Sequence, residues 1–142
     1  MKKVLFILSM LLLLVGCDSK EEYFSKNCLK KTNSNDLKDV IDEKVIYNNN
    51  DELKEIQISR EFDGKNKEVI SYIKKSIKDY NNDLLKNKNV KIQVVTDEDS
   101  KYSLKYYYDV DKMKKKELDN LDIKKNSIKY LKYLQKQEFD CK

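Results

Sequence analysis

The stretch that decides the fold runs over residues 40–62 and reads VIDEKVIYNNNDELKEIQISREF. Its two arms, Val40–Tyr47 and Leu53–Phe62, flank the segment Asn48–Asp51, whose residue types favour turns. In the second arm apolar and polar residues alternate, as they do in a half-buried strand. The apolar face of that arm is formed by Ile56, Ile58 and Phe62. The whole stretch therefore predicts a β-hairpin.

The residues that follow predict a helix and a second hairpin. Asp63 and Gly64 are expected to end the strand. A helix is expected over Lys65–Lys86, because apolar residues recur there at helical spacing. Val90–Val94 and Tyr102–Val110 then alternate again, which predicts a second pair of strands around an acidic turn.

Two further elements complete the expected domain. A strand is expected at Lys26–Thr32, and a second helix is expected near the C-terminus, where Asn126 or Ser127 can cap it. The apolar stripe of this helix is formed by Ile128, Leu131 and Leu134. A loop or a short helical turn through Met113, Leu118 and Leu121 is expected to lead to it. The order of elements predicts an α+β fold, a small antiparallel sheet with two helices packed on one face. Residues 26–142 are expected to form this single domain.

The N-terminus indicates where the protein is located. A basic start, Met1–Lys3, precedes the apolar run Val4–Val15, which is shorter than the roughly 20 residues that span a bilayer. The run closes in Leu14–Cys17, which looks like a bacterial lipobox: a branched residue three places before a cysteine, and a small residue directly before it. The alternatives are an ordinary secreted protein and an N-terminal anchor helix.

The lipobox implies a set of boundaries. Residues 1–16 are expected to be a lipoprotein signal peptide, Cys17 the lipidated residue, and residues 17–25 a polar tether. The mature protein would then be anchored by its lipid to the extracytoplasmic face of the cell membrane.

The other two cysteines, Cys28 and Cys141, form an even pair in a chain that is expected to be exported, where disulfides persist. A disulfide between them would join the start of the domain to its last residues. The alternatives are two free thiols, or a redox pair, which is more often close in sequence.

Composition excludes several classes of chemistry. The chain of 142 residues has no histidine and two glycines, so it lacks an imidazole base, a histidine metal ligand and a glycine-rich phosphate loop. The acidic stretches Asp97–Asp99 and Asp109–Asp111 do not match a calcium-binding loop and are expected to be solvated turn residues. We therefore expect a protein that is not an enzyme, with no cofactor and no metal.

Charge argues against nucleic acid as a partner. Thirty basic residues face twenty-five acidic ones, and they are dispersed with a single arginine, Arg60, whereas nucleic-acid-binding proteins usually carry a basic stripe. The densest lysines lie at Lys112, Lys114, Lys115, Lys116, Lys124, Lys125, Lys129 and Lys132. These lysines could lie on an anionic surface, but lysine is abundant throughout the chain and a solvated surface is the preferred interpretation.

One contact point stands out in the second hairpin. Tyr106 and Tyr108 are expected to face the core, so that Tyr107 faces outward. Together with Lys105 it would form a small exposed contact point, since tyrosine is enriched at contact surfaces.

Taken together, the chain resembles the small YehR-like lipoproteins of unknown function, common in Firmicutes. The resemblance is carried by the lipobox, Cys28 within NCLKK, the strand VKIQV at 90–94, the run YYYDVD at 106–111, and LKYL at 131–134 followed by FDCK at 139–142. It covers nearly the whole chain. It implies an α+β domain, lipidation and a pairing of the two outer cysteines, and it supplies no catalytic residues.

These observations favour a membrane-anchored, non-catalytic binding module at the cell envelope. Its partner would be an envelope protein or an anionic wall polymer. The alternative function is that of an immunity or superinfection-exclusion lipoprotein, which protects the cell against a toxin, a lysin or a phage.

Overall fold

The computed structural model describes residues 21–142. The expected signal peptide and Cys17 therefore lie outside the described residues. The elements in chain order are β1 (Tyr23–Asn33), β2 (Leu37–Asn48), β3 (Leu53–Gly64), α2 (Lys67–Leu84), β4 (Val90–Asp97), β5 (Lys101–Asp109), the 3-10 turn η2 (Val110–Lys112), α3 (Lys115–Asn120), α4 (Ser127–Lys136) and β6 (Asp140–Cys141).

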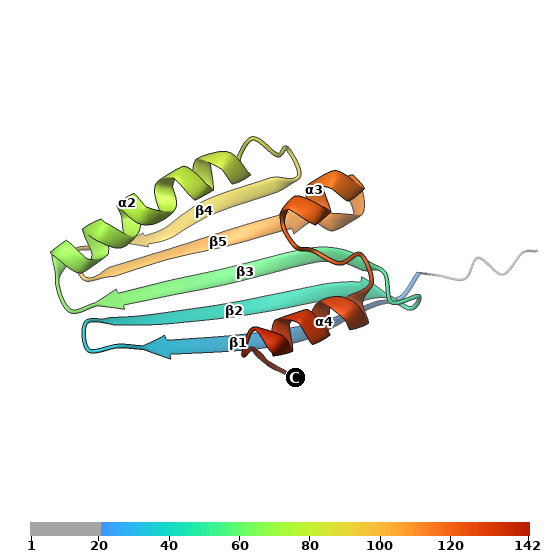
Figure 1. Ribbon diagram of the computed structural model, residues 1–142, viewed down its shortest axis with the longest axis horizontal. Helices are drawn as coiled ribbons and strands as arrows, with labels where there is room; N and C mark the ends of the chain where they lie inside the picture. The colour runs from blue at the N-terminus through green and yellow to red at the C-terminus, as the bar shows by residue number, and fades with distance from the viewer. Residues whose placement is uncertain (1–20) are drawn as a thin grey trace, which may run out of the picture.

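The strands form one antiparallel sheet in the order β4-β5-β3-β2-β1-β6 (Figure 1). The predicted hairpin is confirmed as β2 and β3. At its open end both strands are longer than predicted: β2 begins at Leu37 and β3 ends at Gly64. A sheet with separate helices makes the fold mixed α+β, as the order of elements predicts.

The turn between β2 and β3 is held by Asn48. This side chain is 2% exposed, and its Oδ1 accepts hydrogen bonds from the backbone N–H of Asn50 at 3.0 Å and of Glu52 at 2.9 Å. Asp51 has a φ of 58°, a left-handed conformation that aspartate tolerates better than most residues. The asparagine-rich segment therefore supplies both the positive φ and the hydrogen bonds that the turn needs.

The strand β1 begins at Tyr23, three residues before the expected start of the strand at Lys26, so it includes the last residues of the expected tether. Its first residues pair with the end of β2, where Tyr23 lies opposite Asn48 and Phe24 opposite Tyr47. The rings of Phe24 and Tyr47 stack with their centroids 6.0 Å apart. This contact between aromatic rings extends the strand toward the N-terminus.

The strand β3 ends at Gly64, which confirms that Asp63 and Gly64 end the strand, although both residues still belong to it. The backbone N–H of Gly64 donates to the carbonyl of Ser100 at 2.8 Å. A Cβ at Gly64 would lie 2.9 Å from the side chain of Ile70. The glycine therefore allows α2 to approach the end of the strand closely.

Helix α2 begins at Lys67, two residues later than predicted, because Asn66 is its N-cap and accepts from the Val69 N–H. The second predicted helix is α4, and Asn126 is the residue that caps it, since its Oδ1 accepts from the Lys129 N–H at 3.1 Å. A third helix, the six-residue α3, occupies the segment expected to be a loop or a short helical turn.

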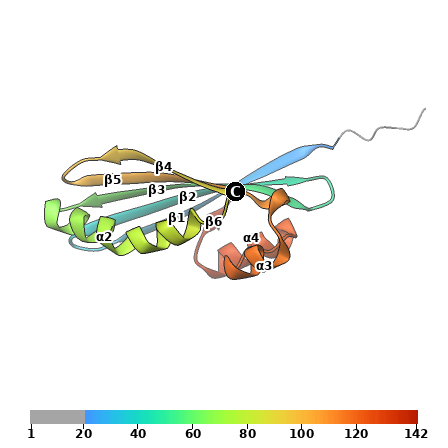
Figure 2. The same ribbon diagram turned by 90° about the horizontal axis from the view of Figure 1, so that it is seen from above.

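The core lies between the sheet and the helices. Its fully buried side chains include Val45, Leu53, Ile56, Ile70, Leu104 and Val110. Tyr106 and Tyr108 are each 5% exposed, which confirms that they face the core. Figure 2 shows the molecule from above, with the sheet nearly edge-on and α2, α3 and α4 drawn below it.

Candidate functional site

The register of the strands assigns side chains to the two faces of the sheet. One row across four strands consists of Cys28, Glu43, Ile58 and Tyr106. Helices contact this row at two places. The Tyr106 hydroxyl donates to Asn81 of α2 at 3.1 Å, and the Tyr130 hydroxyl of α4 donates to Glu43 at 2.7 Å. The face that carries this row is therefore the covered face.

The neighbouring rows project from the opposite side, since successive side chains of a strand alternate. We call this side the open face. On the three central strands it carries Lys38, Val40, Asp42, Lys44, Ile46, Glu55, Gln57, Ser59, Glu61, Asp63, Lys101, Ser103, Lys105, Tyr107 and Asp109. Each of these side chains is half-buried or exposed. Apart from Val40 and Ile46, the side chains on the central strands of the open face are polar or aromatic, and the face is solvent-accessible along the length of the sheet.

Shallow depressions run along the open face. The largest has a volume of about 700 Å³ and lies where Glu55, Lys91, Tyr107 and Asp109 meet. A second, of about 250 Å³, is also bordered by Tyr107, together with Lys105. The structure therefore brings Tyr107 and Lys105 together at a hollowed part of the surface, where the sequence predicts a contact point.

Two acids of the open face lie directly opposite each other. Glu55 and Asp109 are cross-strand partners on β3 and β5, an arrangement that is unfavourable for like charges. Each carboxylate has its own donor: Gln57 Nε2 lies 2.7 Å from Glu55, and Lys112 Nζ lies 2.6 Å from Asp109. These donors offset the repulsion, so this end of the face carries charges of both signs within one depression.

The covered face contains an acid that sequence reasoning missed. Glu43 is 3% exposed, and its burial raises the pKa of its carboxyl group to about 7, although the hydrogen bond from Tyr130 acts in the opposite direction. The strand pattern indicates this burial, because Glu43 lies between Ile41 and Val45 at a spacing of two residues and therefore shares their face. Its contact with α4, 87 residues away, could not be derived from that alternation.

The outer cysteines lie side by side. Cys28 of β1 is the cross-strand partner of Cys141 of β6, with their sulfur atoms 2.03 Å apart and their Cα atoms 3.9 Å apart. The adjacent pair, Asn27 and Lys142, exchanges both backbone hydrogen bonds. The cysteines therefore occupy the non-hydrogen-bonded position, where side chains approach most closely, and they form a disulfide-capable pair.

The acidic stretches considered for calcium lie next to lysines. Four of their carboxylates form ion pairs: Asp97 with Lys74, Asp99 with Lys67, Asp109 with Lys112, and Asp111 with Lys54 and Lys125. Within residues 21–142, no group of three or more acidic, cysteine or histidine residues is placed to hold a metal ion. None of the helices in this part of the chain is long and apolar enough to cross a membrane.

Comparison with known proteins adds information on the fold. No protein-family model and no curated protein matches the chain. An NMR structure of a protein from Streptococcus pneumoniae TIGR4 is similar, with a TM-score of 0.57 and 12% sequence identity over 91% of this chain and 90% of that chain. At this identity the likeness shows the fold alone. The resemblance to the YehR-like lipoproteins stays a prediction.

Proposed function

We propose that this protein is a lipid-anchored, non-catalytic binding module on the extracytoplasmic face of the cell membrane, and that a partner protein of the cell envelope docks on its open face. Cys17 carries the lipid in this proposal, and Cys28 and Cys141 form a structural disulfide. The helices pack on one face of the sheet only and leave the other face free for the partner.

The observation that carries the proposal is the hollowed, polar open face around Tyr107 and Lys105. Aromatic side chains with polar neighbours are typical of contact surfaces between proteins. The charge of the face selects among partners. Its central strands carry four lysines (38, 44, 101, 105) and five carboxylates (42, 55, 61, 63, 109), so the face is not basic. An anionic polymer would be attracted weakly, whereas a protein with mixed charges can complement both signs.

Site-directed photo-crosslinking in cells tests this proposal. The photo-reactive residue p-benzoylphenylalanine would replace Tyr107 in one variant and Tyr72 in a matched control. Tyr72 is a tyrosine on the outer side of α2 with 71% exposure. Both substitutions replace a tyrosine by the same photo-reactive aromatic residue. A difference in crosslinking between the two variants therefore reflects the position of the residue on the protein surface.

We expect the variant at position 107 to form one reproducible adduct with an envelope protein, and the variant at position 72 to form none. Equal adducts at both positions, or none at position 107, would contradict docking on the open face. An adduct with a toxin, lysin or phage protein would favour the alternative function of immunity or superinfection exclusion.

A further inference from the structure

The first described residue is attached firmly to the domain. Glu21 Oε1 lies 3.0 Å from Lys54 Nζ and accepts from Asn48 Nδ2 at 2.6 Å. Lys54 also lies 3.2 Å from Asp111 and 3.3 Å from Glu52, and its side chain is 17% exposed. Its hydrogen bonds to Glu21 and Asp111 raise the pKa of Lys54, so the amine stays charged. The chain therefore enters the domain at a defined point, between the β2–β3 turn and η2.

This attachment limits the distance to the expected anchor. Glu21 follows Cys17 by four positions, and four residue steps span at most about 14 Å. The end of the domain that carries Lys54 would then lie close to the lipid headgroups. Electrostatic attraction between exposed charges acts over about 8 Å at physiological salt, so this end is within reach of a charged membrane surface.

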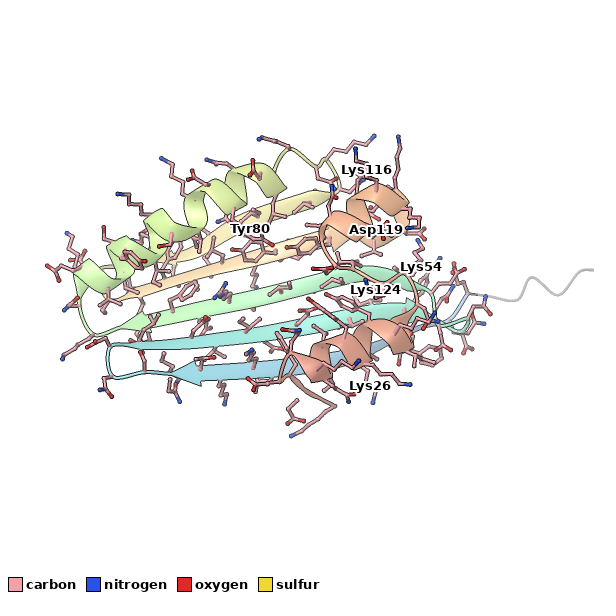
Figure 3. The ribbon with its side chains drawn as sticks, viewed as in Figure 1. Lys26, Lys54, Tyr80, Lys116, Asp119 and Lys124 are labelled. Atoms are coloured by element: carbon pink, nitrogen blue, oxygen red, sulfur yellow. A yellow bond between two sulfur atoms is a disulfide. The ribbon has the colours of Figure 1, made fainter. Side chains whose placement is uncertain are left out.

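The same end carries the densest lysines of the chain. The segment 110–125 holds six lysines (112, 114, 115, 116, 124, 125), all exposed, and four acids (111, 117, 119, 122). Asp111 and Asp119 are already ion-paired with lysines, and Glu117 accepts from the backbone N–H of Lys114. Among the described residues, Lys114, Lys116 and Lys124 have no ion-pair partner. Figure 3 shows Lys54, Lys116 and Lys124 in the part of the molecule nearest the start of β1.

We propose that these six lysines, which we call the basic end, dock on anionic lipid headgroups when the lipid anchor is inserted in the membrane. This inference rests on the lipid anchor of the proposed function. The short link to Cys17 favours headgroups over wall polymers, because it keeps the basic end at the membrane surface. The strands would then run away from the membrane, so that the open face is presented sideways to partners.

Lysine footprinting on vesicles tests this docking. Lipidated full-length protein would be incorporated into vesicles of phosphatidylcholine alone, or of phosphatidylcholine mixed with phosphatidylglycerol, and its lysines acylated and quantified by mass spectrometry. We expect Lys114, Lys116 and Lys124 to react several-fold more slowly on the anionic vesicles. Lys38 and Lys101, at the far end of the sheet, should react equally on both. High salt should remove the protection.

Two variants with the same net charge show whether the protection comes from docking of the basic end or from attraction of the whole protein to the anionic vesicle. The triple variant Lys114→Glu, Lys116→Glu and Lys124→Glu should lose the protection of Lys112 and Lys125. The control triple variant Lys38→Glu, Lys75→Glu and Lys101→Glu has the same net charge and should keep it. Equal protection in the two variants would overturn the docking.

The result also distinguishes this inference from the proposed function. Protein that floats with both kinds of vesicle, but whose lysines react equally on both, contradicts docking of the basic end and leaves the anchor in place. Protein that floats with neither contradicts the anchor, and docking with it.

Discussion

Among single residues, Glu43 is expected to make stability depend on pH between pH 5 and 8. Its carboxyl group is buried between the sheet and α4, and it accepts a hydrogen bond from the Tyr130 hydroxyl. Burial of a carboxyl group disfavours the charged form, and the pKa of Glu43 rises from 4.5 to about 7. The folded state therefore binds a proton over a pH range in which the unfolded chain has already released it.

This difference predicts that the protein becomes less stable as pH rises from 5 to 8. The folded state binds more protons than the unfolded state between pH 4.5 and 7, so the free energy of unfolding falls over this interval and levels off above it. The loss should be about 2 to 3 kcal/mol. Urea unfolding at a series of pH values measures this loss, with the unaltered protein (the parent) compared with the variant Glu43→Gln.

The Glu43→Gln variant provides the control, because its amide can still accept from Tyr130 and does not titrate. We expect it to be more stable than the parent at pH 8 and close to the parent near pH 5. Parallel pH profiles for the two proteins would show that Glu43 is not buried as a neutral acid.

The two residues at the start of α4 differ in their expected contribution to stability. Asn126 caps the helix, whereas the Ser127 hydroxyl is buried and has no hydrogen-bond partner among the described residues. Asn126→Ala should therefore reduce the free energy of unfolding by about 1 kcal/mol. Ser127→Ala should leave it unchanged or raise it, because it removes an unsatisfied polar group. Thermal unfolding compares the two, and equal losses would be inconsistent with these roles.

At the scale of elements, β6 holds the C-terminus to the sheet through a very short strand. It pairs with β1 through two residues, Cys141 and Asp140, opposite Cys28 and Leu29. Lys30 of β1 also contacts the turn between α4 and β6, where its amine donates to the Gln137 carbonyl at 2.8 Å. So short a strand contributes few hydrogen bonds, and we expect the cysteine pair to provide most of its attachment.

Reduction should therefore destabilise the protein strongly. A disulfide between Cys28 and Cys141 would close a loop of more than 100 residues, which stabilises by about 4–5 kcal/mol in the chain-entropy model. Urea unfolding with and without a reductant measures the loss, and thiol counting on the exported, lipidated mature protein, denatured but not reduced, should find no free thiol. The double variant Cys28→Ser and Cys141→Ser should be insensitive to the reductant. A parent that unfolds at the same urea concentration in both conditions would contradict the disulfide.

The strands illustrate what could be predicted from the sequence. Alternation identified both hairpins and correctly placed Tyr106 and Tyr108 in the core, because one buried face imposes a period of two. Gly64 is the last residue of β3, as its residue type predicts, but its close contact with Ile70 of α2 depends on the three-dimensional fold. For α3 the sequence predicts no more than a loop or a short helical turn, because six residues are too few to establish a helical period.

For the whole molecule, the pairing of β3 with β5 was beyond the sequence. It brings Gln57 opposite Tyr107, fifty residues away, with α2 and β4 between them in the chain. The depressions of the open face follow from that pairing, so only the outward position of Tyr107 and Lys105 could be anticipated. The location of the lysine-rich segment beside Glu21 likewise depends on contacts between distant residues.

The lipid anchor at Cys17 is the central claim, because the partner surface and the orientation on the membrane both depend on it. Metabolic labelling of cells with a fatty-acid analogue tests it most directly, with the parent compared with Cys17→Ser. We predict that the mature parent incorporates the label, whereas Cys17→Ser incorporates none and accumulates as the longer precursor. An unlabelled parent, or equal labelling of the variant, would contradict the account.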